Sequence, residues 1–259
     1  MFAFCMCSLY SQAQQPMETE EANLLQAKLL EVSATYEFQT SVNGTENALP
    51  FAIAYGISDR LEIAVEPVPY TSIKSKSTSS VKGVGDIEAT LTYNFFKENK
   101  RFPALALAYE VKFPTARNTF IGTGKADHTF YLIATKNIKR FENHINVGYA
   151  IIGQPAGVTL QNVFAFALAT EFHVNNKLDL IGEILANTSA VPQETNSLIE
   201  NSTSPELSGG EIVGMIGGRY YFNNHFFAAF GVTYDNNNAF LFRPGLTYIF
   251  GHVRSRSKL

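Results

Sequence analysis

Strict alternation of apolar and polar residues runs through most of this chain, in segments of ten to fourteen residues between residues 30 and 250. Successive side chains of a β-strand point to opposite faces, so each segment has one apolar and one polar face. Nearly every charge within the segments lies on the polar face. This pattern is typical of a barrel with lipid outside and water inside. The predicted fold class is therefore all-β, a transmembrane antiparallel up-and-down β-barrel.

Twelve strands are predicted, and an even number is what a bacterial single-chain barrel requires. They span residues 29–41, 49–58, 60–70, 83–96, 102–113, 126–138, 141–152, 160–174, 177–188, 209–222, 225–235 and 239–250. Connections after even strands are short, whereas those after odd strands are mostly longer, including 71–82, 114–125 and 188–208. This layout predicts turns in the periplasm, loops outside the cell, and both termini on the periplasmic side.

The charged face is predicted to look inward, because Lys or Arg facing lipid at mid-bilayer costs about 2 to 4 kcal/mol. Seven charged residues are predicted to line the pore: Glu110, Lys112, Glu171, Glu183, Glu211, Arg219 and Arg243. Rings of charge can set the selectivity of a pore, but the same pairs can also cross-link a filled interior. Apolar inward residues such as Ile181 and Met215 suit a poorly soluble solute and suit interior packing equally well.

Some positions depart from simple alternation. Pro67 and Pro69 cannot donate to a strand ladder and are predicted to end the third strand early. Pro244 predicts a bulge or a locally broken pair in the last strand. Both faces of the sixth strand are apolar, and we place Tyr131 and Ile133 inward.

The two ends of the chain are predicted to lie outside the barrel, and the N-terminal end is predicted to carry an export signal. Cys5 and Cys7, the two cysteines, lie in an apolar opening followed by a small-x-small pattern, which predicts a signal peptide over residues 1–13. A periplasmic segment is expected at 14–28, the barrel at 29–250, and a short basic tail at 251–259. Residues 20–30 could form an amphipathic helix that plugs the periplasmic mouth, or a loosely ordered lead-in.

Composition and motifs argue against several other classes of protein. The formal charge of −3 and a pI near 6.0 offer no basic surface for nucleic acid. The stretch 122–125 lacks the first Gly and the Ser or Thr of a phosphate loop. The five histidines show no metal-ligand spacing, and no G-x-S-x-G nucleophile motif occurs. We therefore expect no enzymatic activity, cofactor or metal site. A soluble barrel is the alternative fold, because its strands would show similar alternation.

Several phrases, in order and spacing, resemble the outer-membrane family named for the meta-pathway of phenol degradation. They lie at 49–66, 83–88, 103–115, 122–127, 144–149 and 182–183. The resemblance implies an outer-membrane barrel, sometimes linked to uptake of aromatic or other hydrophobic compounds, and no characterised chemistry. Leu246, Tyr248 and Phe250 look like the terminal aromatic strand that the barrel-assembly machinery reads, although nine residues follow.

Two functions are consistent with these features. The first is a channel or transporter for passive passage of small hydrophobic or aromatic solutes, with outer-membrane lipid around it. The second is a structural or adhesive surface barrel with a packed lumen, in which the external loops carry the function.

Overall fold

The computed structural model describes residues 17–76, 80–192 and 210–253. The predicted signal peptide, most of the 188–208 loop and the basic tail after Val253 lie outside these residues, so those expectations stay predictions.

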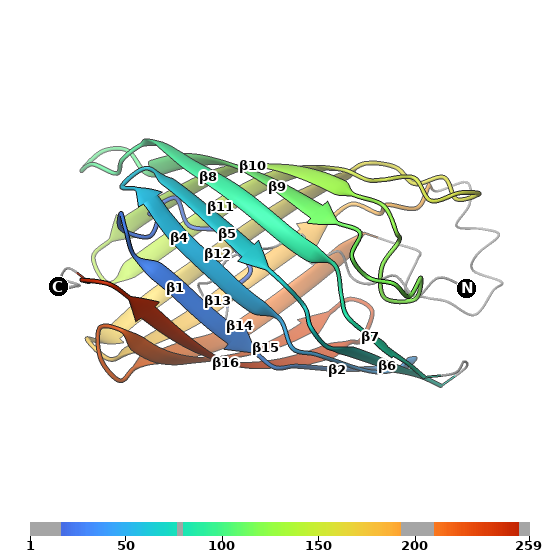
Figure 1. Cartoon of the computed structure of the whole chain (residues 1–259). Coiled ribbons are helices and arrows are strands. Elements are labelled where there is room, and N and C mark those ends of the chain that lie inside the picture. Colours follow the sequence, from blue (N-terminus) through green and yellow to red (C-terminus); the bar gives the residue numbers. More distant parts are fainter. Residues whose placement is uncertain (1–16, 77–79, 193–209, 254–259) are drawn as a thin grey trace.

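The described chain forms one closed antiparallel sheet (Figure 1), in which β1 pairs with β16. Its strands are β1 (Leu30–Thr35), β2 (Glu37–Ser41), β3 (Gly44–Ala48), β4 (Phe51–Ser58), β5 (Leu61–Glu66), β6 (Thr71–Ser75), β7 (Val81–Gly83), β8 (Ile87–Phe96), β9 (Ala104–Phe113), β10 (Asp127–Ile138), β11 (Phe141–Ile151), β12 (Val163–Asn175), β13 (Leu178–Asn187), β14 (Glu211–Tyr221), β15 (Phe226–Asp235) and β16 (Phe240–Phe250). The first eight form four interrupted strands, so the barrel has twelve strands and the predicted fold is confirmed.

The interruptions follow the prolines of the sequence. β5 ends at Glu66 and the chain resumes as β6 at Thr71, which confirms the break predicted at Pro67 and Pro69. The break between β3 and β4 lies beside this one, since the Phe51 amide donates to the Pro67 carbonyl (3.0 Å). Because proline has no N–H, these prolines form a crease across the first strands. The pairing of the second and third strands shifts by one residue across it, from Ile53 opposite Val65 to Ala48 opposite Thr71.

Pro244 produces the local break that was predicted. β16 itself is continuous and stays in register with β15, where Pro244 lies opposite Phe230. On its other side the ladder stops at Tyr36, between β1 and β2, and the Tyr36 amide donates to the Pro244 carbonyl (3.0 Å).

The loops expected after the first and third strands are shorter than predicted. Residues 44–48 form β3, joined to β2 by a tight hairpin at Gly44, which has a φ of 154°. Much of the expected 71–82 loop is β6 and β7, which continue the sheet beyond the crease. The Thr and Ser residues of these stretches suggested loops in the sequence. In the structure β3 pairs with β2 and β6, and β6 pairs with β7.

The alternation of the strands produces one apolar and one polar barrel surface. The outer surface carries large exposed side chains, among them Leu107, Phe164 and Ile216, the last 72% exposed. Tyr131 and Ile133 are buried at 2% and 0% exposure, which confirms their predicted inward placement. Among the described residues there is no helix long and apolar enough to cross a membrane.

Candidate functional site in the barrel lumen

Residues 17–28, which we call the luminal segment, run inside the barrel before β1 begins. Met17 packs against Ala169, Ile181 and Met215 of three different strands, in the middle of the barrel wall. Lys28 lies beside Gly56, near the end of the barrel that carries the short turns. This end, at residues 59–60, 139–140 and 176–177, is called the short-turn end and corresponds to the periplasmic side of the predicted layout.

The luminal segment is not helical, so of the two alternatives drawn for residues 20–30 the amphipathic helix is wrong. Its amides are satisfied by side chains of the barrel wall rather than by helical carbonyls. The Ala22 amide donates to Thr135 Oγ1 (2.8 Å), and the Leu25 amide donates to Glu62 Oε2 (2.6 Å). The lead-in alternative described the backbone better, but the segment is fixed to the wall at many points.

Glu183 and Arg243 hold the beginning of the luminal segment. Glu183 accepts hydrogen bonds from the amides of Glu18 (3.1 Å) and Thr19 (2.5 Å), and from the Thr19 hydroxyl. Arg243 pairs with Glu18 and, through its second terminal nitrogen, with Glu37 at 2.9 Å. Glu183 thus binds the backbone at positions 18 and 19, while Arg243 binds the side chain of Glu18.

The middle of the segment lies against β8 to β11. Asn146 exchanges two hydrogen bonds with the Glu20 backbone, at 2.6 and 2.9 Å. The Ala22 methyl packs on an apolar wall patch that includes Tyr131, and the Ala22 carbonyl accepts from Asn94 Nδ2 (2.6 Å). Only a small side chain fits at Ala22, which is fully buried.

The end of the segment passes very close to β4. The Lys28 amide donates to the Gly56 carbonyl (2.7 Å), and the Gly56 amide donates to the Leu29 carbonyl (3.1 Å). A Cβ at Gly56 would lie 2.3 Å from the Gln26 carbonyl oxygen. Gly56 therefore lets the segment lie directly on the backbone of the wall.

A cavity of about 770 Å³ lies between the luminal segment and the wall at the short-turn end. Its polar lining is Glu21, Asn23, Gln26, Glu31, Asn137, Lys139, Arg140, Glu142, Glu171, His173, Arg219 and Asn224, and its apolar lining is Leu24, Leu25, Leu29, Phe227, Ile249 and Val253. The cavity thus presents charges of both signs beside an apolar surface.

The structure places the seven predicted pore residues on the inner side of the wall. Six are buried, and Glu211 is half-buried at the start of β14. Glu183 and Arg243 bind the luminal segment, while Lys112 pairs with Asp127. Their role in lining a pore stays a proposal.

Glu171 and Arg219 form a buried ion pair across the face of β13. The Arg219 terminal nitrogens lie 3.2 and 3.4 Å from the two Glu171 oxygens, and the guanidinium is 5.5 Å from the Phe227 ring centre. Arg219 also donates to the Tyr221 hydroxyl (3.0 Å). This pair is part of the cavity lining.

Sequence reasoning missed the polar wall residues that bind the luminal segment, namely Asn94, Thr135 and Asn146. The same alternation marks them as inward-facing, so that signal was present. Their importance depends on the luminal segment, which carries no strand alternation of its own and was placed outside the barrel.

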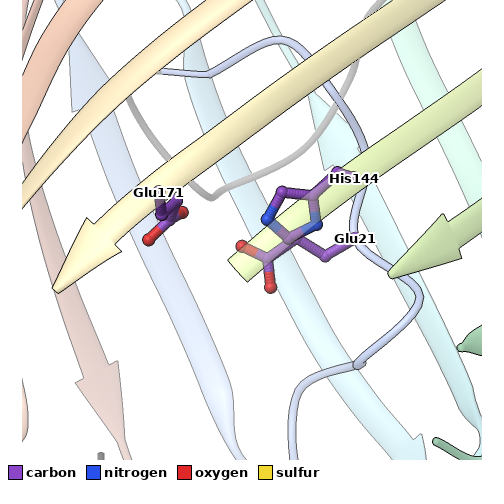
Figure 2. Close-up of side chains that lie close together, drawn as sticks. All are labelled: Glu21, His144 and Glu171. Atoms are coloured by element: carbon purple, nitrogen blue, oxygen red, sulfur yellow. The ribbon is translucent and has the colours of Figure 1, made fainter. Parts of the chain in front are cut away.

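Three buried ligand-type side chains meet at the edge of the cavity. Ligand atoms of Glu21, His144 and Glu171 lie within 4.8 Å of one another. Figure 2 shows the outer edge of the His144 ring directed toward the two carboxylates, with Glu21 on the coil and Glu171 on the neighbouring strand. Local spacing in the sequence could not reveal this group, because its members come from three separate elements.

A closed antiparallel barrel with an apolar outer surface and a charged interior defines an outer-membrane β-barrel protein. The chain belongs to the family described as "Putative MetA-pathway of phenol degradation", whose profile matches residues 21–203. The family resemblance noted in the sequence is thereby confirmed. No curated protein sequence matches the chain.

Solved structures with the same fold include channels and porins. An outer membrane channel from Pseudomonas putida F1 is 12% identical with a TM-score of 0.66, covering 91% of this chain and all (100%) of that one. The NanC porin is 9% identical with a TM-score of 0.58, covering 84% and 98%. The KdgM porin, solved with disordered oligogalacturonate, is 10% identical with a TM-score of 0.57, covering 85% and 99%. At these identities the likeness concerns the fold.

Proposed function

We propose that the protein is a channel for small solutes across the outer membrane, and that the luminal segment closes it in the conformation described here. The cavity at the short-turn end carries this proposal, because it forms a chamber of about 770 Å³ on the luminal side of the wall. The segment that bounds the chamber is held by hydrogen bonds and ion pairs, which can be exchanged for water. Structural similarity to channels and porins supports the same class of function.

The lining of the cavity favours an apolar solute with one polar group. Leu25, Phe227 and Ile249 provide an apolar surface, and Arg140 and Arg219 provide cations nearby. An aromatic or other hydrophobic compound with an acidic or hydroxyl group would contact both kinds of side chain. This chemistry agrees with the solute class that the family resemblance implies.

A packed structural or adhesive barrel is the second candidate. It is favoured by the wall residues that fill the lumen together with the luminal segment, because several of them are fully buried and bonded to one another. In that case the external loops would carry the function, and trimming residues 188–208 would abolish partner binding without changing flux.

Single-channel conductance in planar bilayers separates the two candidates. We expect brief, infrequent openings of the full-length barrel and steady conductance after deletion of residues 17–28, because the deletion removes the main obstruction in the lumen. A chain shortened at its other end, after Val253, is the matched control and should behave like the full-length protein. Silence of both the full-length and the deleted forms would contradict the channel and favour the packed barrel.

A further inference from the structure

His144 has an unusual environment for a buried histidine. The side chain is 0% exposed, and its Nε2 atom has no hydrogen-bond partner among the described residues. Its other nitrogen, Nδ1, lies 3.0 Å from Thr135 Oγ1, which also accepts from the Ala22 amide. Leaving a buried polar atom unpaired is destabilising, so a group that binds Nε2 would be stabilising.

The geometry around His144 is that of a metal ligand. Ligating histidines use one ring nitrogen for the metal and fix the other through a hydrogen bond, as Thr135 fixes Nδ1 here. In Figure 2 the free edge of the ring points toward the carboxylates of Glu21 and Glu171. The three ligand atoms lie within 4.8 Å of one another. Two ligands that each lie about 2.0–2.2 Å from one Zn²⁺ ion are separated by less than this, so the three side chains need to approach one another only slightly.

The charges around the group favour a divalent cation. Arg219 pairs with Glu171 at 3.2 Å and offsets part of the negative charge. Further carboxylates lie close by, since His173 is 2.8 Å from Asp179 and 3.7 Å from Glu142. Four carboxylates therefore lie near the group, against Arg219 and the Lys139 and Arg140 of the cavity lining. A divalent ion would offset part of the negative charge that gathers at the two glutamates.

A second group, formed by Glu171, His173 and Asp179, is also compact. It does not offer a vacant ligand atom, because His173 Nδ1 is bonded to Asp179 and Nε2 faces Glu142. His173 is thus explained as a cross-link within the wall, whereas His144 is not.

We propose that Glu21, His144 and Glu171 bind a divalent transition-metal ion of the Zn²⁺ type. One imidazole and two carboxylates suit Zn²⁺, whereas Ca²⁺ and Mg²⁺ take oxygen ligands only. Glu21 and Glu171 line the cavity, which gives the ion a route from the short-turn end. This proposal differs from the expectation of no metal site, which was drawn from the spacing of the histidines in the sequence.

The ion would also regulate the channel, and this part rests on the proposed function. Glu21 belongs to the luminal segment, His144 to β11 and Glu171 to β12, so one ion joins the segment to the wall. Bound metal therefore stabilises the closed conformation and lowers the frequency of opening.

Zinc binding by the refolded full-length protein tests the site without reference to conductance. After treatment with a chelator, we expect equilibrium dialysis to give one Zn²⁺ per barrel, and His144→Gln to weaken binding at least tenfold. His128→Gln, which changes a half-buried histidine of β10 beside Tyr109, is the matched control and should retain the ion. Equal binding by wild type and His144→Gln would overturn the site.

Glu21→Gln guards against a folding defect, because Glu21 lies outside the barrel strands. It should also lose the ion while migrating as a folded barrel in heat-shift electrophoresis. In bilayers, Zn²⁺ added on the short-turn side should reduce the opening frequency of the wild type. The same addition should not change the opening frequency of Glu21→Gln. Zinc that binds without changing the openings would overturn the regulatory part, whereas a barrel without conductance would contradict the proposed function and leave the binding result standing.

Discussion

At the scale of single residues, the interior of the barrel depends on pairing of buried charges. Lys112 on β9 and Asp127 on β10 lie in register opposite one another and form an ion pair, with side-chain exposures of 9% and 4%. A buried charge that loses its partner is far more costly than a missing pair, because desolvation is then uncompensated. The inward charges are therefore structural as well as candidate pore residues.

Replacing Lys112 by Met should lower the free energy of unfolding by about 3–5 kcal/mol, because Asp127 would stay buried without its cation. The double variant Lys112→Met, Asp127→Asn should recover most of this loss. Urea unfolding in lipid vesicles measures both. Equal stability of the single and double variants would show that water enters the lumen there and screens the pair.

At the scale of elements, the contact between the luminal segment and β4 decides whether the lumen is closed. The segment lies against Gly56, where a Cβ would meet main-chain oxygens of Gln26 at 2.3 Å and Leu25 at 2.8 Å. These are backbone atoms that no side-chain rotation can move. The segment and a larger residue at position 56 cannot occupy these positions together.

Gly56→Ala should therefore detach the end of the luminal segment and raise the open probability several-fold in planar bilayers. Gly182→Ala is the matched control, because a Cβ there has nothing within 4 Å and lies in a strand of the same barrel. An unchanged open probability for Gly56→Ala would mean that the segment is not what closes the channel.

At the scale of the whole molecule, the barrel is held in the membrane by its outer surface. Ile216 lies in the middle of β14 and is 72% exposed, while Tyr220 lies near the short-turn end of the same strand and is 44% exposed. The cost of a charge on the lipid face depends on depth. The two positions therefore compare mid-bilayer with the interface.

Ile216→Arg should lower the free energy of unfolding in vesicles by about 2–4 kcal/mol, whereas Tyr220→Arg should cost about 0–1 kcal/mol. The difference arises because an arginine near the interface reaches water and one at mid-bilayer does not. Equal losses at both positions would contradict the depth that we assign to β14.

Sequence alone determined the architecture, because side-chain direction in a strand is a local property with a period of two residues. It placed the lipid face, the seven inward charges, the ambiguous Tyr131 and the proline breaks. The bounds of the later strands, from β9 onward, agree with their predictions to within three residues.

Only the tertiary structure decided what occupies the lumen. The spacing of Ala22, Leu25 and Leu29 suggested a helix, but lumen side chains such as Glu62 and Thr135 bind the amides that a helix would have bonded internally. Those partners lie 37 and 113 residues away along the chain. The meeting of Glu21, His144 and Glu171 likewise depends on barrel closure and strand register, which bring distant residues together and leave no local periodicity in the sequence.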